Sequence, residues 1–170
     1  MPMKMIGVIL IIVSCGSVGF QIAANYRREE NTLRQLIRIL DYMECELQYR
    51  LTPIPALCRQ AWGAFPEMPG KVFWELSLEI DAQIAPDLAQ CMSTVLNNVK
   101  SIPTVTRKEL ELLGKSMGRF DLDGQLKGLN AVREDCKQNL KILTDNRENR
   151  LRSYQTLGLC AGAALAILFV

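Results

Sequence analysis

Two long stretches without a charged side chain stand at the two ends of the chain, and they limit its possible folds more than any other feature. The first covers residues 5–24 and has 20 uncharged residues, ten of which are Ile, Val, Leu or Phe. The second covers residues 154–170 and has 17 uncharged residues. A helix needs roughly 20 apolar residues to cross the hydrocarbon core of a bilayer. We therefore predict an N-terminal transmembrane helix over residues 1–24 and a C-terminal one over residues 154–170.

The basic residues predict how these two helices are oriented. Beyond the outer ends of the two stretches the only charged side chain is that of Lys4, whereas arginines flank both inner ends. These arginines are Arg27, Arg28, Arg34, Arg147, Arg150 and Arg152. Positively charged residues concentrate on the cytoplasmic side of a membrane. We therefore predict a two-pass protein of the cell membrane, with both termini outside and residues 25–153 in the cytoplasm.

The N-terminal segment allows two other interpretations. A secretory signal peptide would need a small-x-small cleavage site, and Ser17-Val18-Gly19 is a poor one. The segment Ile12-Val13-Ser14-Cys15 resembles the lipobox of bacterial lipoproteins, in which the cysteine is lipidated after cleavage. The apolar run continues nine residues past Cys15, which favours an uncleaved span. The alternative is a lipid-anchored, envelope-facing binding protein that is processed at Cys15.

Between the two ends, apolar residues recur at the three- and four-residue spacing of helices. The clearest case is residues 26–51, with Leu33, Leu36, Ile37, Leu40, Met43, Leu47 and Leu51 on one face. Prolines, glycines and capping residues divide the rest into helices over about 53–64, 72–84, 87–99, 106–117 and from 125 onward. We predict an all-α fold, with a cytoplasmic bundle of about six helices between the two transmembrane helices.

Local side-chain patterns predict where some of these helices begin. Thr52 is placed to cap the second helix, and Thr106 and Glu109 have the spacing of a capping box. Asp121 or Asp123 is placed to cap the last helix. Nothing obvious breaks that last helix before the end of the chain.

The first and last helices of the bundle would both emerge from the cytoplasmic side of the membrane, so they would run antiparallel. Equal depth then pairs Met43 with Cys136 and Leu47 with Val132. Within the predicted spans, small residues recur every fourth position: Cys15, Gly19 and Ala23 in the first, and Gly158, Gly162 and Ala166 in the second. Small residues let membrane helices approach closely, so we predict that the two spans pack together. Binding of other membrane proteins by the same stripes is the alternative.

Residue types with catalytic or ligand-binding chemistry are sparse. The chain has no histidine, which excludes His-dependent triads and histidine metal sites. The six cysteines have no C-x-x-C spacing. The paired carboxylates Glu44 with Glu46 and Glu75 with Glu79 suggest a solvated face or partner contacts, and 20 Lys and Arg against 18 Asp and Glu argue against a nucleic-acid partner. We therefore predict no enzyme activity, cofactor, metal site, nucleic-acid partner or small-molecule substrate.

Two motifs carry a resemblance to a known family. The first is Glu44-x-Glu46-Leu47-x-Tyr49-x-x-Thr52-Pro53-Ile54, and the second is Leu112-Leu113-Gly114-x-x-Met117-Gly118-x-x-Asp121, with Gln125 beginning the final helix. With the length and the two terminal spans, they resemble the stage III sporulation protein AB family of endospore-forming bacteria over essentially the whole chain. Members of that family usually have Phe-Gly where this chain has Leu113-Gly114, and Leu-Gly where it has Met117-Gly118.

The resemblance implies a component of the channel apparatus that links mother cell and forespore. It also implies that the cytoplasmic domain is similar to that of type II secretion inner-membrane platform proteins, which dock a cytoplasmic secretion-type ATPase. On this basis we expect a non-catalytic platform or scaffold in the mother-cell membrane, whose partners are that ATPase and other stage III sporulation channel proteins. The expected contact residues are Glu44, Glu46, Tyr49, Asp121 and Gln125. A structural role for Tyr49 and Gln125 is the alternative.

Overall fold

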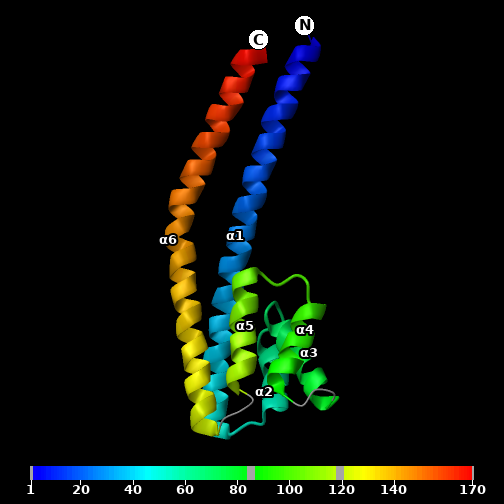
Figure 1. The fold of residues 1–170 in the computed structure, drawn as a ribbon, viewed down its shortest axis with the longest axis vertical. Coiled ribbons are helices and arrows are strands. Elements are labelled where there is room, and N and C mark those ends of the chain that lie inside the picture. The colour runs from blue at the N-terminus through cyan, green and yellow to red at the C-terminus, as the bar shows by residue number, and fades with distance from the viewer. Residues whose placement is uncertain (1, 84–86, 118–120, 170) are drawn as a thin grey trace. The chain divides into compact units, whose positions relative to one another are not determined.

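The computed structural model describes the backbone of residues 2–83, 87–117 and 121–169, and the side chains of those residues apart from 2–20, 22–23 and 146–169. Over the described backbone the chain forms six α-helices and no strand (Figure 1). The helices are α1 (Pro2–Arg50), α2 (Ile54–Ala64), α3 (Gly70–Asp81), α4 (Leu88–Asn98), α5 (Thr104–Met117) and α6 (Leu122–Phe169). The predicted all-α fold with six helices is confirmed, and the last helix is continuous as predicted.

The chain divides into two compact units, and α1 and α6 each contribute to both. Unit 1 contains residues 1–28 and 142–170, and unit 2 contains residues 29–141. Within the described part of the chain, no helix combines the length and the apolar character needed to cross a bilayer. The domain boundaries at residues 24 and 153 and the two spans stay predictions.

The six predicted span-packing residues belong to unit 1. They are Cys15, Gly19, Ala23, Gly158, Gly162 and Ala166, and their side chains lie outside the described residues. Their packing therefore stays a prediction too.

Unit 2 has an apolar core to which all six helices contribute. Completely or almost completely buried side chains include Leu36 of α1, Leu57 of α2, Phe73 of α3, Leu96 of α4, Leu110 of α5 and Leu129 of α6. Most of the apolar stripe predicted for residues 26–51 is buried. Ile37 is only half-buried, and Leu51, which follows the last residue of α1, is 65% exposed.

Consecutive helices of unit 2 pack against one another, α2 on α3, α3 on α4 and α4 on α5. Two glycines allow particularly close approaches. A Cβ atom at Gly114 of α5 would lie 2.7 Å from Cβ of Met92 in α4, and one at Gly128 of α6 would lie 2.7 Å from Cβ of Ser116 in α5. Both distances are too short for carbon atoms, so these contacts require residues without a side chain.

Two of the predicted helix caps are wrong. The residue before α2 is Pro53, no side chain caps this helix, and the Thr52 hydroxyl instead donates to Glu46 Oε2 at 3.4 Å. Helix α5 begins at Thr104, two residues earlier than predicted, so Thr106 and Glu109 lie inside the helix and are buried. The predicted cap of α6 is confirmed, because Asp121 Oδ1 accepts a hydrogen bond from the Gly124 amide at 3.1 Å.

Side chains distant in sequence, and not the predicted local caps, form hydrogen bonds with the free backbone groups at two helix ends. Glu29 Oε1 of α1 accepts a hydrogen bond from the Val105 amide in the first turn of α5, at 3.1 Å. A carboxylate is favourable there because the N-terminus of a helix carries partial positive charge. Arg107 Nη2 donates to the carbonyl oxygens of Leu96 (2.5 Å) and Val99 (3.3 Å) at the C-terminus of α4. These bonds tie α1, α4 and α5 together at one end of unit 2.

Candidate functional site

The five predicted contact residues lie towards one end of unit 2: three in the last two turns of α1, Asp121 just before α6 and Gln125 in the first turn of α6 (Figure 1). We call this the distal end, and it is formed by residues 44–52 and 121–125. The opposite end, formed by residues 29–31 and the α4–α5 connection (residues 99–103), is the proximal end. The two ends differ in which side chains they expose.

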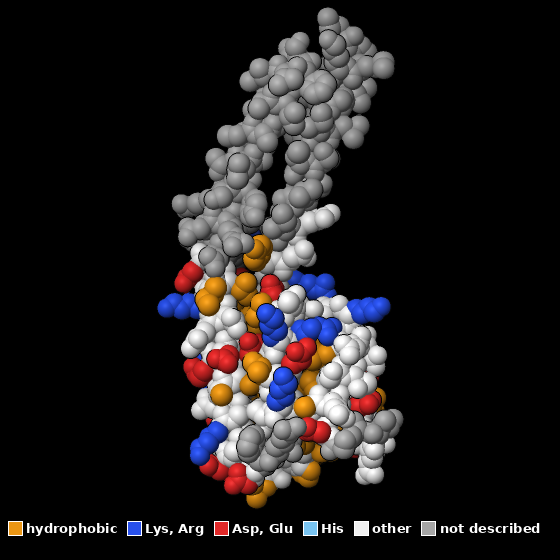
Figure 2. All heavy atoms as spheres, in the orientation of Figure 1, with side chains coloured by type: hydrophobic (Ala, Val, Ile, Leu, Met, Phe, Trp, Pro, Cys, Tyr) orange, Lys and Arg blue, Asp and Glu red, His pale blue; other side chains and the backbone are white. Residues whose placement is uncertain are grey.

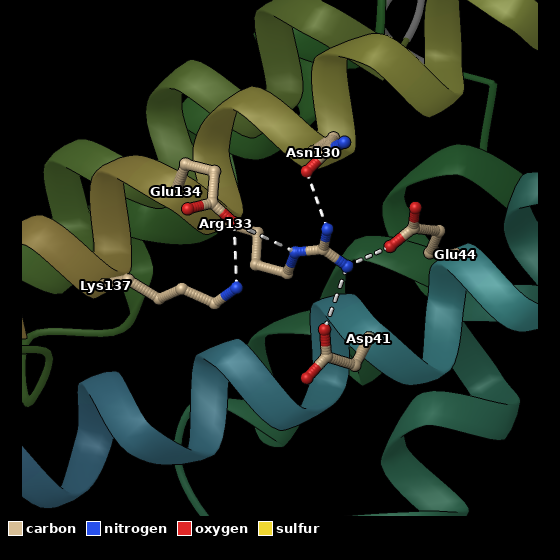
Figure 3. Close-up of polar contacts among 6 residues, drawn as sticks. All are labelled: Asp41, Glu44, Asn130, Arg133, Glu134 and Lys137. Carbon is tan, nitrogen blue, oxygen red and sulfur yellow. Dashed lines mark hydrogen bonds and ion pairs between the residues drawn. The ribbon is translucent and has the colours of Figure 1, made fainter.

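Glu44 is engaged inside unit 2. Its carboxylate forms an ion pair with Nη1 of Arg133 on α6, and the same nitrogen lies 3.0 Å from Oδ1 of Asp41 (Figure 3). The side chain of Arg133 is 18% exposed and that of Glu44 is 24% exposed. Arg133 therefore balances two carboxylates of α1 and joins α6 to α1.

The surrounding network agrees with the register predicted for these two helices. Arg133 lies between Val132 and Cys136 on α6, and its partner Glu44 lies between Met43 and Leu47 on α1. Asn130 accepts a hydrogen bond from Arg133 Nη2 at 2.6 Å, and Lys137 donates to Glu134 at 2.8 Å (Figure 3). These last two bonds join side chains within α6 and hold Arg133 in place on that helix.

The other predicted contact residues differ widely in exposure. Glu46 is also engaged internally, because its side chain is 12% exposed, lies 3.5 Å from Arg50 Nη1 and accepts the bond from Thr52. Tyr49 is 78% exposed. Asp121 is exposed but acts as the cap of α6, and Gln125 is half-buried. Tyr49 is thus the predicted contact residue that is most available to a partner.

Two exposed apolar residues at the distal end were not among the predicted contacts. Leu51 is 65% exposed and Leu122 is 38% exposed. Leu51 has a φ of 52°, in the left-handed region that usually holds glycine after a helix. We call Tyr49, Leu51 and Leu122 the distal apolar patch, and Figure 2 shows hydrophobic side chains exposed at this end of unit 2. The helix-ending segment Thr52-Pro53 was the sequence signal that Leu51 lies beyond the buried stripe.

A buried polar contact joins α5 to α6. Glu109 is 4% exposed, and its Oε1 accepts a hydrogen bond from Asn139 Nδ2 at 2.9 Å. Burial raises the pKa of the Glu109 carboxyl, and the negative charge of Asp135 raises it further. Cys136 is fully buried beside it, and burial raises the pKa of this thiol as well.

Two further cysteines of unit 2 are buried and have low reactivity. Burial raises the pKa of the Cys58 thiol to about 12 and also raises that of Cys91, so both stay protonated and are poor nucleophiles or metal ligands. Cys45 is exposed. Across the residues that the structure describes, no three His, Cys, Asp or Glu side chains gather where they could hold a metal ion.

Comparison with known proteins identifies relatives over the whole length. The family described as stage III sporulation protein AB matches residues 4–170. Stage III sporulation protein AB of Bacillus subtilis (strain 168) is 23% identical over 172 residues, which cover 99% of each chain. A solved structure of a stage III sporulation protein AB superimposes with a TM-score of 0.62 at 18% identity, over 72% of this chain and 98% of that one.

The likeness to the solved structure supports the helical fold, and the family match covers nearly every residue. The family name denotes a sporulation protein and no known enzyme. The chain therefore belongs to the stage III sporulation protein AB family and has a role in sporulation.

Proposed function

We propose that this protein is a non-catalytic membrane platform of the sporulation channel that links mother cell and forespore. It would dock a cytoplasmic secretion-type ATPase and organise other stage III sporulation channel proteins. Residues 1–24 and 154–170 would span the mother-cell membrane with both termini outside, and residues 25–153 would face the cytoplasm. The observation that carries the docking proposal is the distal apolar patch of Tyr49, Leu51 and Leu122.

The patch has the composition of a protein contact surface. Tyrosine and leucine provide apolar area at the centre of an interface, while charged side chains surround it. Here Arg50 and Asp121 are exposed neighbours of the patch in sequence. The left-handed backbone of Leu51 costs conformational energy that glycine would avoid, and such strain is often found where a side chain serves binding.

Glu44 and Glu46 each bind other side chains of the protein, which gives them a supporting role in this proposal. Glu44 attaches the end of α1 to α6 through Arg133, and Glu46 holds Thr52 just after Leu51. Both therefore position the chain segment that carries Tyr49 and Leu51. Partner contact by Glu44, Glu46, Asp121 and Gln125 stays a prediction.

Co-purification from sporulating cells tests the docking. Tagged full-length protein carrying Tyr49→Ser and Leu51→Gly should recover at least about tenfold less ATPase than the wild type, because two central interface side chains are removed. The matched control is Leu78→Ser, since Leu78 is 46% exposed on α3, a helix that contributes no residue to the patch. Equal ATPase recovery with the wild type and the double variant would refute the docking site.

Topology is a separate test of the membrane part of the proposal. Reporter fusions at about residue 100 and at the C-terminus should report cytoplasm and outside, respectively. Mass spectrometry should find residues 1–24 retained. A mature chain that begins at a lipidated Cys15, with residue 100 outside, would instead favour an envelope-facing binding protein.

A further inference from the structure

We propose that an exposed ridge on α3 binds a cationic amphipathic helix of another protein. The ridge consists of Trp74 and Leu78 together with Glu75 and Glu79, and we call it the α3 ridge. The inference goes beyond the proposed function and does not depend on it, because all of these residues belong to unit 2. It adds a second interaction surface, on a helix that contributes no residue to the distal apolar patch.

The sequence of α3 places two rows of side chains along the outer side of the helix. Residues four apart lie on the same side of a helix, about 6 Å apart along its axis. Trp74 and Leu78 are four apart and are 36% and 46% exposed, so they form an apolar row. Glu75 and Glu79 each follow one residue later and form a partly exposed acidic row. The opposite side of the helix, which includes Phe73, is buried.

The neighbouring helices mark the two edges of the α3 ridge. On the α2 side, Asp81 is ion-paired with Arg59 at 2.5 Å, so these two charges balance each other. On the α4 side, burial and then the negative charge of Glu79 raise the pKa of the Cys91 thiol, so Glu79 faces α4. Helix α4 itself has no charged residue, and its N-cap, Asp87, adds a further negative charge. The acidic row therefore lies along an edge that is negative throughout.

The two carboxylates of the acidic row have no cation of their own. In the described part of the chain, neither Glu75 nor Glu79 is ion-paired with a Lys or Arg side chain. Lys71, in the first turn, is the basic residue of α3. Residues 54–99 contain five acidic residues against two basic ones, whereas the whole chain has 18 against 20. A partner that reaches the α3 ridge thus meets a locally negative surface.

These features fit an amphipathic helix with basic residues along one edge. Tryptophan is among the side chains that contribute most to protein interfaces, and two apolar residues one turn apart match the apolar side of a helix laid along α3. Unpaired carboxylates beside them favour Lys or Arg at the edge of that helix. The same carboxylates repel anionic lipid headgroups and nucleic-acid phosphates. Charge complementarity therefore selects a cationic helix as the occupant.

Trp74 reports directly on occupation of the α3 ridge. In the detergent-solubilised full chain, Trp62→Phe leaves Trp74 as the sole tryptophan, and its quenching by acrylamide is measured as peptide is added. The probe is an alanine-rich helical peptide with leucine at every fourth position and lysine directly after each leucine, and the matched peptide has glutamate in place of lysine. The lysine peptide should shield Trp74 and bind about tenfold more tightly, because two charge pairs change from repulsion to attraction. The chain without Trp62→Phe is measured in parallel and should show the same preference.

Exchange of the charges separates recognition from folding. Glu75→Lys combined with Glu79→Lys should reverse the preference, so that the glutamate peptide binds more tightly. Glu111→Lys changes an exposed glutamate on α5 in the same way and should leave the preference for the lysine peptide unchanged. A loss of folding would abolish binding of both peptides and would not produce a reversal.

The variants of the docking experiment distinguish this surface from the distal apolar patch. Leu78→Ser should lose the lysine peptide and keep the ATPase, whereas Tyr49→Ser with Leu51→Gly should keep the peptide and lose the ATPase. Equal binding of the two peptides, or no shielding of Trp74 by either, would overturn the cationic partner and leave the platform proposal intact. Shielding that increases with protein concentration in the absence of peptide would also overturn it, because a second copy would then cover the ridge.

Discussion

In unit 2, α6 packs against both α1 and α5, and the two contacts are built from different chemistry. The α1 contact uses charges near water, with Arg133 placed between Asp41 and Glu44. The α5 contact uses a buried carboxylate, Glu109 with Asn139, and a close backbone approach at Gly128. The same helix therefore has one side that water and salt can reach and one side that they cannot.

The difference teaches how each contact responds to change. Partly exposed charge pairs contribute little free energy and are weakened by salt. The stability of contacts made by buried polar groups or close-packed backbones depends strongly on adding or removing a single atom, because water cannot fill a gap or solvate a charge there. We expect substitutions on the α5 side of α6 to have larger effects than substitutions on the α1 side.

The largest effect is expected where α5 and α6 approach most closely. Gly128→Ala adds a Cβ atom 2.7 Å from Cβ of Ser116, and the overpacking should lower the free energy of unfolding by about 1–2 kcal/mol in spite of the better helix propensity of alanine. Urea unfolding of the detergent-solubilised full chain measures it.

A matched control is available in α2. A Cβ at Gly63 would meet nothing within 4 Å, so Gly63→Ala should be neutral or gain up to about 1 kcal/mol. Adding Ser116→Gly to Gly128→Ala should restore part of the loss, because it removes the opposing carbon. If the two alanine variants were equally stable, the close α5–α6 approach would be wrong.

A smaller effect, with a defined pH dependence, is expected at Glu109. Burial holds the pKa of this carboxyl above its ordinary value of 4.5, so the folded state binds its proton more tightly than the unfolded state does. Stability therefore falls as the pH rises from about 4.5 through the folded pKa. Glu109→Gln should add on the order of 1 kcal/mol at about pH 8 and almost nothing at about pH 4.

Unfolding curves at the two pH values measure this difference. Glu111→Gln is the control, because Glu111 is exposed on the same helix, and it should change stability little at either pH. A gain for Glu109→Gln that is the same at both pH values would show that ionisation of Glu109 is not its cause.

The smallest effect is expected on the α1 side. Arg133→Met leaves Asp41 and Glu44 without their shared cation, and the loss should be about 0.5–1 kcal/mol at low salt and less at about 1 M salt. Arg59→Met breaks an ion pair with Asp81 at 2.5 Å in which both side chains are 45% exposed, and should cost less. A salt-independent loss larger than that of Gly128→Ala would reverse the ranking of the two contacts.

The periodicity of the sequence predicted the helices and much of the core, because burial repeats along each helix. It did not predict how helix ends are satisfied. Thr106 has the right spacing for a local cap, yet the amide of Val105 binds Glu29, a residue 76 positions away. Such partners meet only after the chain has folded, so local spacing carries no information about them.

The candidate site was predicted only in part, because it too depends on contacts between residues that are distant in sequence. Tyr49 is exposed as a contact residue should be, but the partner of Glu44 is Arg133, 89 positions away. Leu51 was assigned to the buried stripe because leucine is usually inside. Its exposure depends on where α1 ends and on a left-handed backbone, and neither follows from hydrophobic spacing.

The first turns of α5 touch both ends of the chain segment that makes up unit 2. Val105 binds Glu29, and four residues later, about 6 Å along the helix, Glu109 binds Asn139. The bundle is therefore almost a closed ring, whose two ends a short linker could join with a small loss of loop-closure entropy. A circular version of residues 29–141, in which a linker joins the two ends, should therefore keep its fold. The ends of the bundle are simply the places where the flanking segments join it.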